Sequence, residues 1–119
     1  MTTPVQDRGF HLFVYGTLRA EGAAHALLDG ARRVAVASIR GTLYDIDGQY
    51  PALMLYGTQV VNGEVWHVPD AARLARLDAY EGVAEGLFRR VGLDVDGFGC
   101  WVYVAGPALA RKLVKSGGQ

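Results

Sequence analysis

The sequence has one cysteine, no long apolar run and no excess of charge of either sign. Cys100 cannot form an internal disulfide, and a lone cysteine in an aromatic strand is usually a small core residue, which is what we expect here. The longest uncharged stretch, residues 48–63, is interrupted by Pro51 and three glycines, so no run of about 20 apolar residues can span a bilayer. The first residues show no basic patch followed by an apolar segment. We therefore expect a cytoplasmic protein with no membrane partner.

Charge and length narrow the class of protein further. Twelve Lys and Arg balance twelve Asp and Glu, so the chain lacks the basic field that phosphate-backbone binding needs, and we expect no nucleic-acid partner. A length of 119 residues suits one domain, and 50% hydrophobic residues suffice for a core. We expect an N-terminal arm at residues 1–9, one domain at 10–106 and a C-terminal tail at 107–119.

The first part of the domain predicts a strand, a loop and a helix. Phe10 to Tyr15 is a β-branched and aromatic run that Gly16 ends, which is typical of a buried strand. The segment from Glu21 to Asp29 places its apolar residues on one helical face and is followed by Gly30, a residue suited to a helix C-terminus.

Residues 34–68 alternate apolar runs with turn residues and predict a β meander. Two turn signals compete within it. Asn62-Gly63 is a strong two-residue hairpin signal, but a turn at Tyr56-Gly57-Thr58 would leave one long strand up to Val68. We predict the turn at Gly57, with Gly63 as a bulge.

The second half predicts a helix and a hairpin. Asp70 can cap a helix whose apolar residues recur at helical spacing and which ends at Glu81-Gly82. Two apolar runs, Phe88–Val95 and Phe98–Val104, flank Asp96-Gly97, another two-residue hairpin signal. The element order indicates an α+β fold with a strongly bent or closed, mostly antiparallel sheet flanked by short helices.

A first candidate for a binding or catalytic site is the loop between the first predicted strand and helix, with Tyr15, Gly16, Thr17 and Leu18. A sharp turn at Gly16 would present the backbone N–H groups of Thr17 and Leu18 to an anion or a developing oxyanion. An ordinary turn explains the same residues.

A second candidate is Glu81, in the last turn of the helix that begins after Asp70. The unpaired carbonyls and the helix dipole disfavour negative charge there, and burial would raise its proton affinity further, which suits proton transfer near neutral pH. A solvated surface glutamate is the alternative interpretation. Asp78 suits a structural hydrogen-bonding partner, and Tyr103 is the strand aromatic whose hydroxyl could face a pocket.

Other chemistries find no support. The three histidines have no metal-ligand spacing, no cysteine cluster exists, and we expect no metal. Serine-hydrolase, P-loop and dinucleotide-binding motifs are missing from the sequence as well.

Five short stretches, in this order, resemble the γ-glutamylcyclotransferase-like family. They are Phe13–Arg19 (FVYGTLR), Tyr50–Leu53 (YPAL), Val61–Trp66 (VNGEVW), Leu77–Val83 (LDAYEGV) and Trp101–Val104 (WVYV). Within that family, the size of the chain is closest to that of the short bacterial members and of γ-glutamylamine cyclotransferases. The resemblance spans most of the chain, from His11 to Val104. It implies a small mixed β-barrel flanked by helices.

The same resemblance implies the function. It suggests an enzyme that releases 5-oxoproline and an amine or amino acid from a small γ-glutamyl substrate, without metal or cofactor. Glu81 would be the single catalytic residue, with Tyr15–Leu18, Pro51 and Tyr103 at the substrate. Phe88 departs from the family, which often has Tyr there, two residues before Arg90. This departure makes a non-catalytic small-molecule binding module the alternative, and no motif marks the leaving amine or an oligomeric state.

Overall fold

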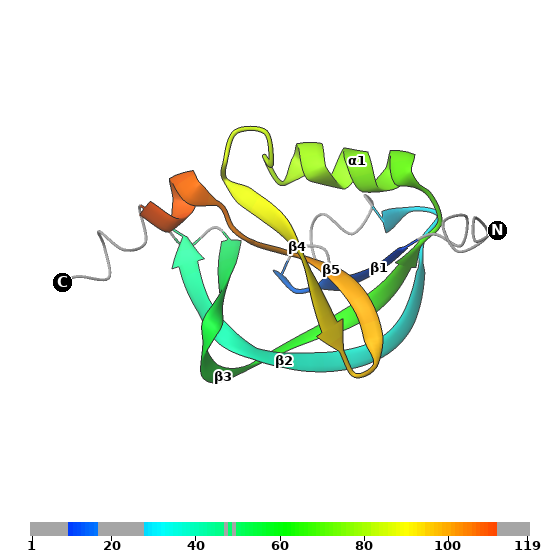
Figure 1. Cartoon of the computed structure of the whole chain (residues 1–119), viewed down its shortest axis with the longest axis horizontal. Helices are drawn as coiled ribbons and strands as arrows, with labels where there is room; N and C mark the ends of the chain where they lie inside the picture. Colours follow the sequence, from blue (N-terminus) through cyan, green and yellow to red (C-terminus); the bar gives the residue numbers. More distant parts are fainter. Residues whose placement is uncertain (1–9, 17–27, 47, 49, 112–119) are drawn as a thin grey trace.

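The computed structural model describes residues 10–16, 28–46, 48 and 50–111. Its elements in chain order are β1 (Phe10–Val14), β2 (Arg32–Ile46), β3 (Tyr50–Val68), α1 (Ala71–Tyr80), β4 (Phe88–Val95) and β5 (Phe98–Ala105). A short helical turn over residues 107–111 follows β5 (Figure 1). The predicted arm at residues 1–9, residues 21–27 of the first predicted helix and the tail beyond residue 111 lie outside the described residues.

The five strands form one mixed sheet in the order β2-β3-β1-β5-β4. All neighbouring strands are antiparallel except β1 and β5, which run parallel. The sheet curls so that its edge strands, β2 and β4, approach each other, as Figure 1 shows. They do not pair with each other in the described part of the chain. The predicted α+β class is confirmed, and the predicted barrel is an open, curled sheet.

The predicted turn at Gly57 is wrong. The chain reverses between Ile46 and Tyr50 instead, which pair with each other, and Gly48 between them has φ +69°. This position lets β2 pair with both parts of β3, residues 50–54 and 59–67, whereas a reversal at Gly57 would leave residues 50–54 without a neighbour on β2. Gly57, with φ +94°, lies where the register with β2 shifts, so that residues 55–58 bulge from the ladder.

Gly63 does not form the predicted bulge. It pairs in regular register with Ala37 of β2. A Cβ at this position would lie 2.3 Å from the carbonyl oxygen of Val14 and 2.6 Å from the ring of Phe13. The glycine is therefore used for the close approach of β3 to β1 rather than for a change of register.

Helix α1 and the β4–β5 hairpin form as the sequence predicts. The Asp70 side chain caps α1 by accepting a hydrogen bond from the backbone N–H of Arg73 at 2.9 Å. Leu74 and Leu77 are buried beneath the helix. The hairpin turns at Asp96-Gly97, both with positive φ, as a two-residue turn of the hairpin type requires.

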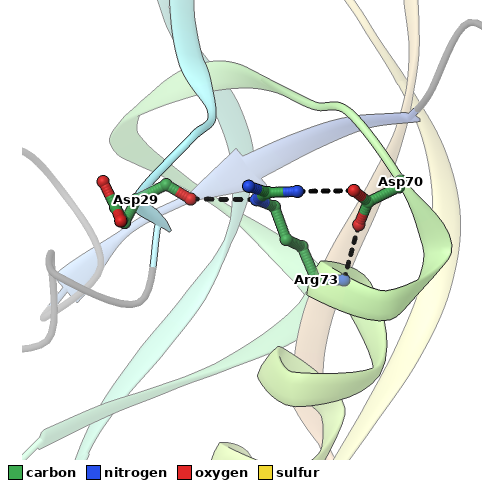
Figure 2. Close-up of polar contacts among 3 residues, drawn as sticks. All are labelled: Asp29, Asp70 and Arg73. Atoms are coloured by element: carbon green, nitrogen blue, oxygen red, sulfur yellow. Dashed lines mark hydrogen bonds and ion pairs between the residues drawn. The ribbon is translucent and has the colours of Figure 1, made fainter.

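Arg73 also ties the segment before β2 to the start of α1 (Figure 2). Its Nε donates to the carbonyl oxygen of Asp29 at 3.1 Å, and its Nη1 donates to the Asp70 carboxylate. Gly30, with φ +86°, lies directly against the guanidinium group, where a Cβ would clash. This contact fixes where the chain enters β2.

The core lies on both faces of the sheet, because successive strand residues point to opposite sides. Leu12 of β1 packs in the cluster beneath α1, with Leu74 and Leu77 of the helix. Phe13 packs in the cluster on the other face, which also holds Cys100. The cysteine is buried, which confirms the prediction of a core residue.

Candidate active site

The end of β1 makes a sharp turn against β3. Gly16 has φ +70°, the left-handed region in which side chains with a Cβ are strained. A Cβ at Gly16 would lie 2.7 Å from Cγ of Pro51, so the backbone and the proline ring pack closely. Thr17 and Leu18, the other residues of the predicted oxyanion loop, lie outside the described residues.

Tyr15 joins three strands through its hydroxyl group. The hydroxyl donates to the backbone carbonyl of Tyr103 on β5 and accepts from the backbone N–H of Leu53 on β3 at 3.3 Å. Burial raises the pKa of Tyr15 well above its usual value, and the nearby Glu81 carboxylate raises it further. The hydroxyl therefore stays protonated at neutral pH and holds the β1 terminus in place.

Glu81 occupies a rigid position at the C-cap of α1. The N–H of Gly82 bonds to the carbonyl of Ala79 at 3.2 Å and the N–H of Val83 to that of Asp78 at 3.1 Å. This is a Schellman motif, with Gly82 in the left-handed conformation at φ +69°. The helix end thus fixes the backbone from which the Glu81 side chain extends.

The Glu81 carboxylate is partly buried, and desolvation raises its pKa from 4.5 to about 7. Within residues 10–16, 28–46, 48 and 50–111, no hydrogen bond satisfies its oxygens. The direction of the shift agrees with the prediction that this glutamate is a stronger base than usual. A carboxyl group with a pKa near 7 can both accept and donate a proton at neutral pH.

Asp78 lies one turn before Glu81 and accepts three hydrogen bonds. Arg90 of β4 donates to it through Nε at 2.8 Å and through Nη2 at 3.1 Å. The Tyr103 hydroxyl donates to the same Oδ1 atom at 2.6 Å. The guanidinium of Arg90 also lies 4.4 Å from the ring centre of Trp101. Asp78 is therefore the hydrogen-bonding partner that the sequence predicted, and it links α1 to β4 and β5.

Tyr103 is almost fully buried, with 3% of its surface exposed. Burial and the bond to Asp78 raise its pKa far above the usual value, and Glu81 raises it further. The Tyr15 hydroxyl bonds to the Tyr103 carbonyl, and the Tyr103 hydroxyl bonds to Asp78, which lies one turn before Glu81. Both tyrosines therefore lie near the C-terminal end of α1.

Two groups that take part in these hydrogen bonds, the Arg90 side chain and the Leu53 N–H, were not predicted from the sequence. The role of Arg90 could have been inferred in part, because a two-residue turn at Asp96-Gly97 sets the hairpin register and places Arg90 opposite Tyr103. The Leu53 N–H that bonds to Tyr15 depends on how β3 packs beside β1, which no local pattern reveals.

Phe88, the departure from the family pattern, is buried at the start of β4. Its ring centre lies 6.0 Å from that of Tyr50, the residue before Pro51. Its side chain contributes packing and no hydrogen-bonding group. In the part of the chain that the structure describes, no three His, Cys, Asp or Glu side chains cluster as a metal site, and no helix is long and apolar enough to cross a membrane.

The sequence matches a known protein family. Residues 12–118 match the family described as gamma-glutamyl cyclotransferase, AIG2-like. The chain belongs to this family. Its resemblance in sequence is thereby confirmed across most of its length. No curated protein matches the chain.

Several solved structures have the same fold. Protein YtfP from Escherichia coli is 33% identical, with a TM-score of 0.63 over 81% of this chain and 82% of that one. An AIG2-like protein from Mus musculus is 25% identical, with a TM-score of 0.71 over 87% of this chain and 83% of that one. An uncharacterized protein from Pyrococcus horikoshii is 20% identical, with a TM-score of 0.70 over 93% and 98%. The fold therefore recurs in bacteria, archaea and animals.

Proposed function

We propose that this member of the family is a γ-glutamyl amide cyclotransferase that releases 5-oxoproline and an amine or amino acid. The observation that carries the proposal is the partly buried Glu81, with its pKa raised to about 7, beside the two tyrosines. Family membership over residues 12–118 and the likeness to a structure named gamma-glutamyl cyclotransferase support it.

The proton balance of this reaction calls for such a group. The substrate α-ammonium carries three hydrogens, and the lactam nitrogen of 5-oxoproline keeps one. Two protons must therefore move as the new C–N bond forms and the old C–N bond breaks, and the leaving amine departs as an ammonium ion. Glu81 accepts each proton from the attacking nitrogen and returns it to the leaving nitrogen. A base with a pKa near 7 can perform both transfers without a large barrier to either.

The tetrahedral intermediate carries an oxyanion that needs fixed donors. In our proposal the loop from Tyr15 to Leu18 supplies them as backbone N–H groups. The left-handed conformation of Gly16 supports this role, because a residue without a Cβ lets the backbone approach a ligand closely. The Tyr15 hydroxyl bonds keep the turn from moving when charge develops.

Phe88 supports one alternative, a binding module that holds γ-glutamyl compounds without converting them. A tyrosine at this position would offer a hydroxyl next to Tyr50, and the phenylalanine offers none. Binding would then persist while turnover is lost.

A panel of γ-glutamyl amides with peptide, polyamine and lysyl leaving groups tests the two functions. Product analysis by mass spectrometry should detect 5-oxoproline with at least one of these compounds. Calorimetric binding of the panel without any product would favour the binding module. No binding and no product would contradict both.

A further inference from the structure

The hydrogen-bond directions around Tyr103 carry an inference about substrate recognition. A tyrosine hydroxyl has one hydrogen to donate, and it accepts through its oxygen. The Tyr103 hydrogen is directed to Oδ1 of Asp78 at 2.6 Å. Toward any further partner, this hydroxyl can therefore act only as an acceptor.

The Asp78 carboxylate is held in the position that accepts the Tyr103 hydrogen. An ionised carboxylate only accepts hydrogen bonds, and Asp78 is paired with the Arg90 guanidinium through both of its oxygens, at 2.8 and 3.1 Å. Arg90 in turn lies over the Trp101 ring on β5. The direction of the Tyr103 hydrogen is thus fixed from three elements, α1, β4 and β5.

The hydroxyl of Tyr15, the second tyrosine, already both donates and accepts a hydrogen bond within the described residues. Its hydrogen is directed to the Tyr103 backbone carbonyl and its oxygen accepts from Leu53 N–H. Tyr103 is consequently the tyrosine with an acceptor to spare.

We propose that the Tyr103 hydroxyl oxygen accepts a hydrogen bond from the substrate α-ammonium, and that Asp78 is a positioning residue that fixes this polarity. The proposal rests on the proposed cyclotransferase function and assigns the amine subsite within it. When Glu81 is ionised, its carboxylate and the Tyr103 oxygen together present acceptors only, which suits an ammonium and repels a carboxylate. Asp78 and Glu81 are three residues apart at the end of α1, a spacing that places their side chains next to each other, so the Tyr103 hydroxyl bonded to Asp78 lies on the Glu81 side of the helix. The α-carboxylate and the oxyanion must then be met by the backbone donors at the β1 turn.

The test compares two inert ligands that differ only in the α-ammonium, L-glutamate and glutarate. Their inhibition constants against 5-oxoproline release give a preference ratio for the amine, and calorimetry measures the same ratio without turnover. The variants are Tyr103→Phe, Asp78→Ala and Asp78→Asn, in the full chain. Tyr44→Phe is the matched control, since it removes the hydroxyl of a tyrosine that bonds only to Tyr56 among the described residues.

We expect Tyr103→Phe to reduce the preference for L-glutamate about tenfold, because a hydrogen bond to a charged group is lost while glutarate affinity is unaffected. Asp78→Ala should reduce it several-fold by freeing the hydroxyl hydrogen. Asp78→Asn should retain the ratio, because an amide oxygen at the Oδ1 position still accepts from both Tyr103 and Arg90. Tyr44→Phe should leave the ratio unchanged. A purely structural role would lower both affinities together and leave the ratio constant.

Two results would overturn the assignment while the proposed function stands. One is turnover by the wild-type protein with an unaltered ratio in Tyr103→Phe. The other is loss of preference in Tyr103→Phe with full preference in Asp78→Ala, which would remove Asp78 from its positioning role. Absence of both 5-oxoproline and ligand binding in the wild-type protein would contradict the proposed function, and the assignment with it.

Discussion

Replacing Glu81 with glutamine should change how the stability of the protein depends on pH, whatever the protein does. Burial raises the Glu81 pKa from 4.5 to about 7, so the folded state holds this proton more tightly than the unfolded chain. Stability therefore falls as pH rises through the interval between these two values, because the charged form is disfavoured only in the folded protein. The amide of Glu81→Gln has the same shape and no such titration.

The size of this effect follows from the pKa shift. A rise from 4.5 to about 7 corresponds to at most about 3.4 kcal/mol, at about 1.36 kcal/mol per pKa unit. The carboxylate is only partly buried, and solvent reduces that cost, so we expect about 2 kcal/mol. Between pH 4.5 and 8, the wild-type protein should lose this much unfolding free energy relative to Glu81→Gln.

Urea unfolding of both proteins at half-unit pH steps measures the difference, in which every other titrating group cancels. Glu85→Gln is the control, since Glu85 is exposed in the loop after α1. Its curve should run parallel to that of the wild-type protein. If the free energy of unfolding changed with pH in the same way in the wild-type protein and in Glu81→Gln, the raised pKa of Glu81 would be refuted. A gain of wild-type stability relative to Glu81→Gln with rising pH would refute it as well.

Three further substitutions test the residues that hold the candidate site in place. Gly16→Ala should cost about 1–2 kcal/mol of unfolding free energy, because its φ is +70° and the new Cβ would meet Pro51, and it should lower turnover per folded molecule more than tenfold. Full specific activity in a destabilised Gly16→Ala protein would remove this turn from the site. Gly82→Ala should cost about 1 kcal/mol by straining the end of α1, and an unchanged urea midpoint would argue against the Schellman motif. Arg90→Gln should lower the free energy of unfolding by about 1–2 kcal/mol in the same assay, since it breaks a half-buried ion pair with Asp78. An unchanged free energy of unfolding would show that this ion pair does not stabilise the protein.

The elements with strong local signals were predictable from the sequence. Helix α1 has a capping Asp70, buried leucines at helical spacing and Gly82 beyond its end, and the structure reproduces all three. The hairpin at Asp96-Gly97 likewise needs only its own turn residues, because both adopt the positive φ that such a turn requires. Glu81 could be located because its position depends on the helix end alone.

The turn between β2 and β3 shows where local signals are insufficient. Gly48 and Gly57 both adopt positive φ, so turn chemistry alone does not choose between them. The choice is set by how much of β3 can pair with β2, and the surplus residues 55–58 are absorbed as a bulge. Pairing over such a distance is a property of the whole sheet.

The polar links of the site were hidden for a similar reason. The bonds from Arg90 and Tyr103 to Asp78 join residues 12 and 25 positions away, and they form only because the fold brings the end of α1 near β4 and β5. Sequence reasoning named Asp78 as a hydrogen-bonding partner and Tyr103 as a pocket residue. It could not connect them, since helix-to-sheet packing is decided by the core.

The rate of 5-oxoproline release by Glu81→Gln, measured beside the wild-type protein and Glu85→Gln on the best γ-glutamyl amide, tests the central proposal most directly. We expect Glu81→Gln to lose about a hundredfold or more in kcat/KM, because the amide cannot carry either proton, while Glu85→Gln keeps the wild-type rate. In the wild-type protein, kcat/KM should fall as pH drops below about 7, where the Glu81 base becomes protonated. A folded Glu81→Gln protein that releases 5-oxoproline at the wild-type rate would contradict the proposed role of this residue.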